Sequence, residues 1–156
     1  MATVAIIPAR GGSKRIPRKN IKPFLGKPII AYSIETALQS RLFDEVMVST
    51  EDDEIAVLAL QCGAKVPFRR SERASNDFAT TTDVLLEVLT TYQSQGKGFE
   101  FGCCIYPTAP FITIDLLGRV WQMMIDHAYD TVFPVLRFSS PIQRALRIEG
   151  ARASMF

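Results

Sequence analysis

The chain alternates short apolar runs with segments whose apolar residues recur every three or four positions. Val4 to Ile7 is an apolar run that predicts a buried strand, and Pro8 ends it because proline cannot donate a ladder hydrogen bond. Glu149-Gly150 predicts a hairpin turn with 151–156 as its returning strand. Other segments of strand length and composition are 45–49, 66–69, 101–105 and 131–136.

Between these runs, the spacing of apolar residues is typical of amphipathic helices. The polar stretch 71–82 lacks that spacing and is predicted to be a loop. Leu117, Val120, Trp121 and Met124 are expected to face inward from the last predicted helix. Four helices are predicted. The first follows Pro28, and the second runs from a Thr50-x-x-Asp53 capping pattern to Gly63. The third covers about 82–92, and the fourth begins near Asp115.

Alternating strands and helices indicate an α/β fold, with a Rossmann-like, doubly wound and mostly parallel sheet that has helices on both faces. We expect one domain over 1–156. Ligands of such sheets bind outside the carboxyl ends of the strands. The loop that follows the first strand therefore lies where a substrate is expected.

That loop is basic and rich in glycine. Gly11 and Gly12 are expected to allow positive φ and to let backbone N–H groups approach phosphate oxygens. The loop has neither G-x-x-x-x-G-K-[ST] nor G-x-G-x-x-G, so it is a different kind of phosphate binder, or else a solvated basic turn. Its cations are Arg10, Lys14, Arg15, Arg18 and Lys19.

Composition narrows the class of protein. The net charge of +2 is largely local to residues 10–19, which favours a small anionic ligand and argues against nucleic acid. No apolar run suits a membrane span, and the N-terminus does not resemble a signal peptide. Cys62, Cys103 and Cys104 are predicted to be reduced core residues of a cytoplasmic protein, without a metal-binding spacing.

The run from Ile7 to Asn20 resembles the I-x-A-R-x-G-S-K-x-[IL]-x-x-K-N loop of nucleotidyltransferases that activate acidic sugars with CTP, the sialic acid cytidylyltransferase family. The resemblance covers essentially the whole chain. In 68–72, an R-P-x-E motif is matched with Arg69 as its arginine and Arg70 in the place of proline. The further matching segments are 26–34, 48–52, 68–72 and 106–111.

The resemblance implies CMP transfer from CTP to an acidic nonulosonate, with Mg²⁺ as cofactor. Tyr106, where sialic acid enzymes carry glutamine, and 140–146 resemble the pseudaminic acid branch. A sialic, legionaminic or Kdo-type substrate stays open. Arg10 and Lys19 are the implied catalytic residues, and Tyr106, Asp77 and Thr81 the implied sugar contacts. The implied nucleotide contacts are Ala9, Arg10, Gly11, Gly12, Ser13, Lys14, Lys19, Asn20 and Arg69.

Members of that family continue beyond this length, through a dimerisation segment and a D-[IV]-D motif that binds magnesium. We therefore expect the chain to be an N-terminal portion or a truncated product whose metal carboxylates lie beyond residue 156. The full-length protein is expected to be a homodimer. The alternative is a nucleotide-binding fragment without catalysis.

Overall fold

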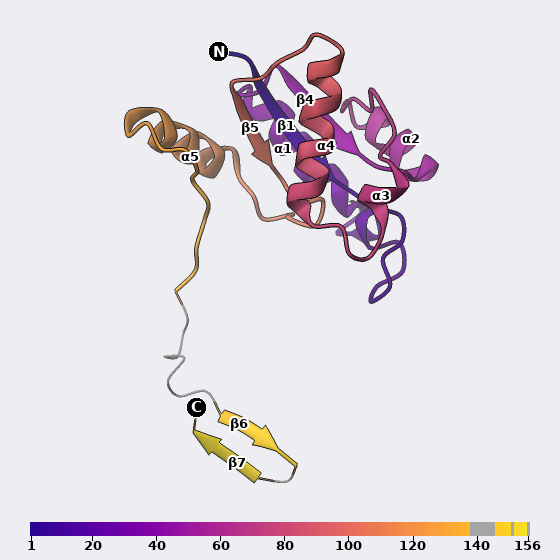
Figure 1. Ribbon diagram of the computed structural model, residues 1–156, viewed down its shortest axis with the longest axis vertical. Helices are drawn as coiled ribbons and strands as arrows, with labels where there is room; N and C mark the ends of the chain where they lie inside the picture. Colours follow the sequence, from indigo (N-terminus) through magenta and orange to yellow (C-terminus); the bar gives the residue numbers. More distant parts are fainter. Residues whose placement is uncertain (138–145, 151, 156) are drawn as a thin grey trace. The chain divides into compact units, whose positions relative to one another are not determined.

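The computed structural model describes residues 1–137, 146–150 and 152–155 (Figure 1). The chain divides into two compact units, Met1–Trp121 and Gln122–Phe156. The single domain expected over 1–156 stays a prediction. In the described part of the chain, no helix is both long enough and apolar enough to cross a membrane.

A three-stranded parallel sheet forms the centre of the first unit, in the order β4 (Glu45–Ser49), β1 (Thr3–Pro8), β5 (Phe101–Cys104). Ile6 of β1 pairs with Met47 of β4. Central strands of parallel sheets are covered on both faces, which explains the unbroken apolar run of β1. The strands predicted at 4–7, 45–49 and 101–105 are confirmed, although the last is only half-buried.

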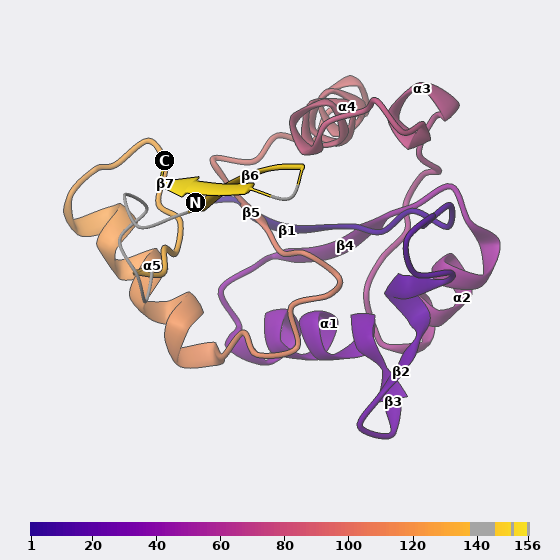
Figure 2. The same ribbon diagram turned by 90° about the horizontal axis from the view of Figure 1, so that it is seen from below.

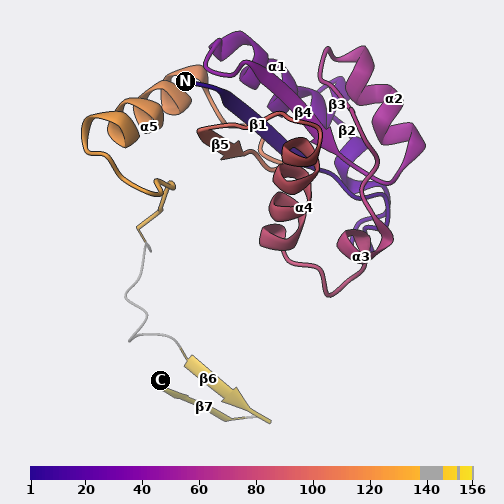
Figure 3. The ribbon, with the colours of Figure 1, turned by 45° about the horizontal axis from the view of Figure 1, so that its top comes forward.

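Helices cover both faces of this sheet, as the α/β prediction requires. Helices α1 and α4 lie on opposite sides of it (Figures 2 and 3). The remaining short elements are η1 (Lys19–Ile21), β2 (Pro23–Phe24), β3 (Lys27–Pro28) and α3 (Glu72–Ser75). The longer helices are α1 (Ile29–Ser40), α2 (Asp53–Gln61), α4 (Thr81–Ser94) and α5 (Ile114–Asp126).

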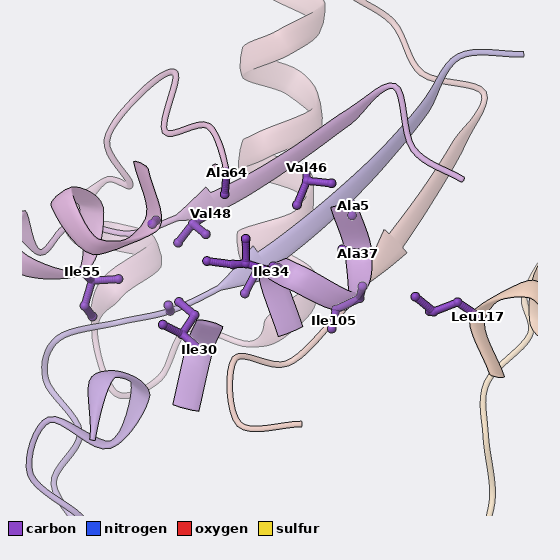
Figure 4. Packing of buried hydrophobic residues seen from close by; sticks show 13 residues of the cluster. Ala5, Ile30, Ile34, Ala37, Val46, Val48, Ile55, Ala64, Ile105 and Leu117 are labelled. Carbon is purple, nitrogen blue, oxygen red and sulfur yellow. The ribbon is translucent and has the colours of Figure 1, made fainter. Parts of the chain in front are cut away.

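The core is split by the sheet into two clusters. Ala5 and Ile7 of β1 belong to the cluster that includes Ile34 of α1 and Val48 of β4. Figure 4 shows Ala5, Ile34 and Val48 in this cluster. Val4 and Ile6, together with Met47, face α4 and pack with its Val88 and Tyr92. Successive side chains of a strand point to opposite faces, so one apolar run supplies both clusters. Of the stripe predicted on the last helix, only Leu117 is buried.

The helix starts differ from the prediction in one respect. Asp52, not Thr50, caps α2, since its carboxylate accepts a hydrogen bond from the Ile55 amide at 3.0 Å. The predicted loop 71–82 is wrong in part, because it contains α3 and the first two residues of α4. The polar residues that suggested a loop are helix caps, Ser71 for α3 and Thr80 for α4.

Two predicted strands are wrong. The segment 66–69 forms no strand; a single bridge joins the preceding Lys65 to Met47, and Pro67 has no amide to extend it. Residues 131–136 are not a strand either, and Leu136 at their end is 95% exposed. Of the cysteines expected in the core, Cys104 is exposed.

In the second unit, β6 (Leu146–Glu149) and β7 (Arg152–Met155) pair antiparallel around Gly150, whose φ is 60°. The predicted returning strand is therefore confirmed over the described residues. Residues 140–145, most of the segment that suggested the pseudaminic acid branch, lie outside the described residues, as do Ala151 and Phe156.

Candidate functional site

A pocket of about 270 Å³ opens beside the loop that follows β1. Its walls come from that loop, from the loop between α3 and α4, and from the segment after β5. It lies at the carboxyl end of a parallel strand, as expected for an α/β sheet. The lining residues are Pro8, Arg10, Ser13, Lys19, Asn20, Arg70, Ala74, Asn76, Asp77, Ala79, Thr80, Thr81, Val84, Tyr106, Pro107 and Thr108.

The base of the loop is fixed by buried contacts. The Ala9 amide donates to the Ser49 carbonyl at 2.9 Å, and Ala9 itself is in the core. Asn20, which is also buried, donates from Nδ2 to the Arg10 carbonyl at 2.9 Å. Its Oδ1 atom is buried and has no hydrogen-bond partner among the described residues, although Asn20 lines the pocket. Asn20 thus ties the far end of the loop to its beginning and keeps an acceptor for a ligand N–H or O–H.

The two glycines have different roles, and neither adopts the positive φ that was expected. A Cβ on Gly11 would collide with the Asp52 carboxylate, whereas one on Gly12 would meet nothing within 4 Å. The Gly11 amide donates to Glu51 Oε1 at 2.7 Å, and the Ser13 amide donates to the Gly11 carbonyl at 2.9 Å. Two of the amides expected to bind phosphate are therefore already engaged within the protein.

The loop cations divide into two groups. Arg10 and Lys19 line the pocket, while Lys14 is exposed beside it. Arg18, at a φ of 53°, instead binds Asp52 and Glu54. The Arg18 hydrogen bond is the main cause that holds the pKa of Asp52 below its usual value.

One arginine of the pocket was missed by sequence reasoning. Arg69, the predicted nucleotide contact, lies outside the pocket and pairs with Asp53 at 2.6 Å. Arg70 lines the pocket instead, with 7% of its surface exposed. Its Nε donates to Ser49 Oγ at 3.0 Å, and a terminal nitrogen donates to the Ser49 carbonyl. Burial lowers the pKa of Arg70, but the guanidinium stays charged.

The residues predicted to contact the sugar also line the pocket. The Tyr106 hydroxyl lies 3.1 Å from Thr81 Oγ1, whereas Asp77 contacts Arg10. Ser33 of α1 donates to the Tyr106 carbonyl at 2.9 Å, which holds the backbone after β5. Tyr106 is half exposed and is therefore not simply a core aromatic.

The carboxylates near the pocket do not form a metal site. Within the described residues, no three His, Cys, Asp or Glu side chains are close enough to hold an ion. The aspartates near strand ends have protein partners: Arg18 for Asp52, Arg69 for Asp53, and Thr80 for Asp83. The described residues therefore do not fit the Mg²⁺ that the resemblance implies.

Comparison with known proteins agrees with this geometry. The cytidylyltransferase family model matches residues 4–147. A pseudaminic acid cytidylyltransferase of Campylobacter jejuni subsp. jejuni serotype O:2 is 46% identical, over 100% of this chain and 68% of the relative. A CMP-N,N'-diacetyllegionaminic acid synthase of Legionella pneumophila is 41% identical, over 71% of this chain and 48% of that protein.

Solved structures show the same fold. A CMP:2-keto-3-deoxy-manno-octonic acid synthetase complexed with CTP aligns with a TM-score of 0.69 and 29% identity, over 82% of this chain and 49% of that one. A cytidylyltransferase from Leptospira borgpetersenii aligns with a TM-score of 0.62 at 22% identity. This chain thus spans about half the length of the first structure. By its sequence and its fold, the chain belongs to the cytidylyltransferase family.

Proposed function

We propose that this chain binds CTP and serves the transfer of CMP to pseudaminic acid, with release of pyrophosphate. The observation that carries the proposal is the pocket, which places three cations, Arg10, Lys19 and Arg70, beside the carboxyl end of β1. The 46% identity over the whole chain to a pseudaminic acid cytidylyltransferase supports this sugar over its relatives.

In the reaction, the anomeric hydroxyl of the sugar attacks the α-phosphorus of CTP. A new P–O bond forms while the bond from the α-phosphorus to the oxygen that bridges to the β-phosphate breaks. The hydroxyl proton passes to water, and pyrophosphate leaves with the electron pair. Charge grows on that leaving group, so fixed cations stabilise the transition state more than the ground state. Arg10, Lys19 and Arg70 line the same pocket, which supports this role for them.

The remaining polar groups of the pocket would orient the two substrates. Asn20 Oδ1 can accept a hydrogen bond but cannot donate one, so a ribose hydroxyl or a base amino group suits it better than a phosphate oxygen. The Thr81 and Tyr106 hydroxyls both donate and accept, which suits the hydroxyl and acylamino groups of a nonulosonate.

The test has two parts. Thermal shift with CTP, UTP, ATP and dTTP measures nucleotide binding, because a ligand that binds only the folded state raises Tm. Pyrophosphate release is then measured with CTP, magnesium and either pseudaminic or N-acetylneuraminic acid. We expect CTP to give the largest shift and pseudaminic acid the faster release.

A shift with CTP and no pyrophosphate from any sugar would leave a nucleotide-binding chain without catalysis. Faster pyrophosphate release with N-acetylneuraminic acid would make that sugar the substrate in place of pseudaminic acid. No rise in Tm with any nucleotide would overturn the proposal. The expected homodimer and cytoplasmic location stay predictions, which sedimentation velocity and cell fractionation of the full-length protein can check.

A further inference from the structure

Asp77 connects two walls of the pocket. Its Oδ1 accepts a hydrogen bond from the Arg10 guanidinium at 3.1 Å, and its Oδ2 pairs with the Lys14 ammonium. Both cations belong to the loop after β1, whereas Asp77 belongs to the loop between α3 and α4. One carboxylate therefore takes up two of the cations that were expected to bind phosphate.

The loop that carries Asp77 is held in shape by its own contacts. Asn76 Oδ1 accepts hydrogen bonds from the Phe78 and Ala79 amides, both at 2.9 Å, and Asn76 Nδ2 donates to the Arg73 carbonyl at 2.9 Å. Thr80 then caps α4. The position of Asp77 is thus fixed by neighbours that do not depend on its ion pairs.

We propose that Asp77 is an internal counter-anion of the phosphate loop, which the phosphates of the nucleotide displace when they bind. This inference rests on the proposed function, since it concerns the same pocket. A carboxylate oxygen and a phosphate oxygen are equivalent acceptors for a guanidinium or an ammonium. Arg10 and Lys14 cannot keep both their bonds to Asp77 and a full set of bonds to phosphate.

The contacts of Asp77 also indicate how much the exchange affects affinity. Its side chain is 40% exposed, and those of Arg10 and Lys14 are 36% and 78% exposed. Water and salt screen such pairs, so each lowers phosphate affinity only modestly. The pair with Lys14 is the main cause that lowers the pKa of Asp77, so its carboxylate is charged at neutral pH.

The inference reverses the sugar contact expected of Asp77. A residue that binds substrate weakens binding when it is neutralised, whereas a competing anion strengthens it. Asp77→Asn keeps the shape and removes the charge. We expect it to tighten binding of CTP, and of inorganic triphosphate used as a probe, by about three- to tenfold, as loss of two screened ion pairs predicts.

Titration calorimetry at low salt measures both ligands on the parent chain and on two variants. The control is Asp115→Asn, which removes the same charge from an aspartate that pairs with Arg119 and lies outside the pocket. It should bind both ligands like the parent.

Equal or weaker binding of either ligand by Asp77→Asn, where the parent binds both, would overturn this inference and leave the proposed function intact. Equal tightening by Asp115→Asn would reduce the effect to net charge and would also overturn it. A parent chain that binds neither ligand would overturn the proposed function and this inference together.

Discussion

Strand β4 has a buried charge near each of its ends, and the two charges are satisfied differently. Glu45 at its first residue is 3% exposed and accepts hydrogen bonds from Tyr92, Lys97 and Lys65. Arg70 lies against Ser49 at the last residue, and within the described part of the chain its guanidinium donates only to the hydroxyl and the carbonyl of Ser49. Among the described residues, no carboxylate lies within ion-pair distance of Arg70.

The difference separates a structural charge from a functional one. Removing a charge from water is unfavourable unless counter-ions and hydrogen bonds compensate. At the amino end of β4 two lysines and a tyrosine supply that compensation. At the carboxyl end the compensation is incomplete, and the Arg70 guanidinium lines a pocket. An anionic ligand in that pocket can complete the compensation. Loss of Glu45 should therefore affect folding, and loss of Arg70 should affect binding.

The largest effect is expected for Glu45→Ala. It leaves the buried Tyr92 hydroxyl without its acceptor and two lysines without their counter-ion. We expect the free energy of unfolding to fall by about 3 kcal/mol, with CTP affinity unchanged. Urea unfolding by circular dichroism measures the first quantity and calorimetry the second.

Glu35→Ala is the control, because Glu35 forms one ion pair, with Lys27, and is half exposed. Glu35→Ala should lower the free energy of unfolding by less than about 1 kcal/mol. If both variants lowered the free energy of unfolding by a similar amount, Glu45 would not be the structural charge inferred for the amino end of β4.

Arg70→Gln should lower CTP affinity by about 10- to 100-fold, since it removes charge-assisted hydrogen bonds to the ligand. The free energy of unfolding should change little, because the variant also removes an incompletely compensated buried charge. Its neighbour offers a matched control: Arg69→Gln removes the same charge from an exposed pair outside the pocket. If Arg69→Gln weakened CTP binding more than Arg70→Gln, the assignment of the two arginines would be reversed.

The sequence did contain a signal for Arg70. Ala64, Val66 and Phe68 each pack against one of the two core clusters, whereas Lys65, Pro67 and Arg69 are exposed. A period of two places the next inward side chain at residue 70. The motif comparison pointed to Arg69 instead, because it aligned letters and did not consider on which side of an extended segment each residue lies.

Other parts of the fold and site were predictable for physical reasons. Strands β1 and β4 and the helices that cover them follow from local apolar periodicity, which the core then stabilises. The ion pairs of Asp77 join residues more than 60 positions apart, so no local pattern could predict them. The missing strand at 131–136 shows the same limit, since a strand depends on a neighbour that its own residues do not specify.

A smaller effect is expected for Tyr106→Phe, which removes the hydroxyl that meets Thr81. If Tyr106 and Thr81 contact the sugar, kcat/KM with pseudaminic acid should fall about fivefold, because one neutral hydrogen bond is lost. CTP affinity should stay unchanged. Tyr129→Phe in the second unit is the control. A loss of CTP affinity instead would assign Tyr106 to the nucleotide.

The smallest effect concerns pH. Burial alone would raise the pKa of Glu45, but hydrogen bonds from Lys97, Tyr92 and Lys65 outweigh it and hold the pKa below its usual value. A carboxyl with a lowered folded-state pKa stabilises the fold above its unfolded-state pKa, and this stability is lost as pH falls through the folded-state value.

The parent should therefore lose stability from about pH 5 downward, and Glu45→Gln should lose less over the same range. Urea unfolding at a series of pH values measures both slopes. Asp44 and Asp52 also have lowered pKa values, so part of the slope should remain. Identical slopes in the two proteins would remove Glu45 from the acid response.

The space beside Gly11 has a consequence for how the loop can vary. The Asp52 carboxylate that fills this space also caps α2 and binds Arg18. Any side chain at position 11 would displace both of these contacts at once, whereas position 12 is open. In a library that samples all twenty amino acids at both positions, selection for folded protein should retain glycine alone at the first and a broad mixture at the second.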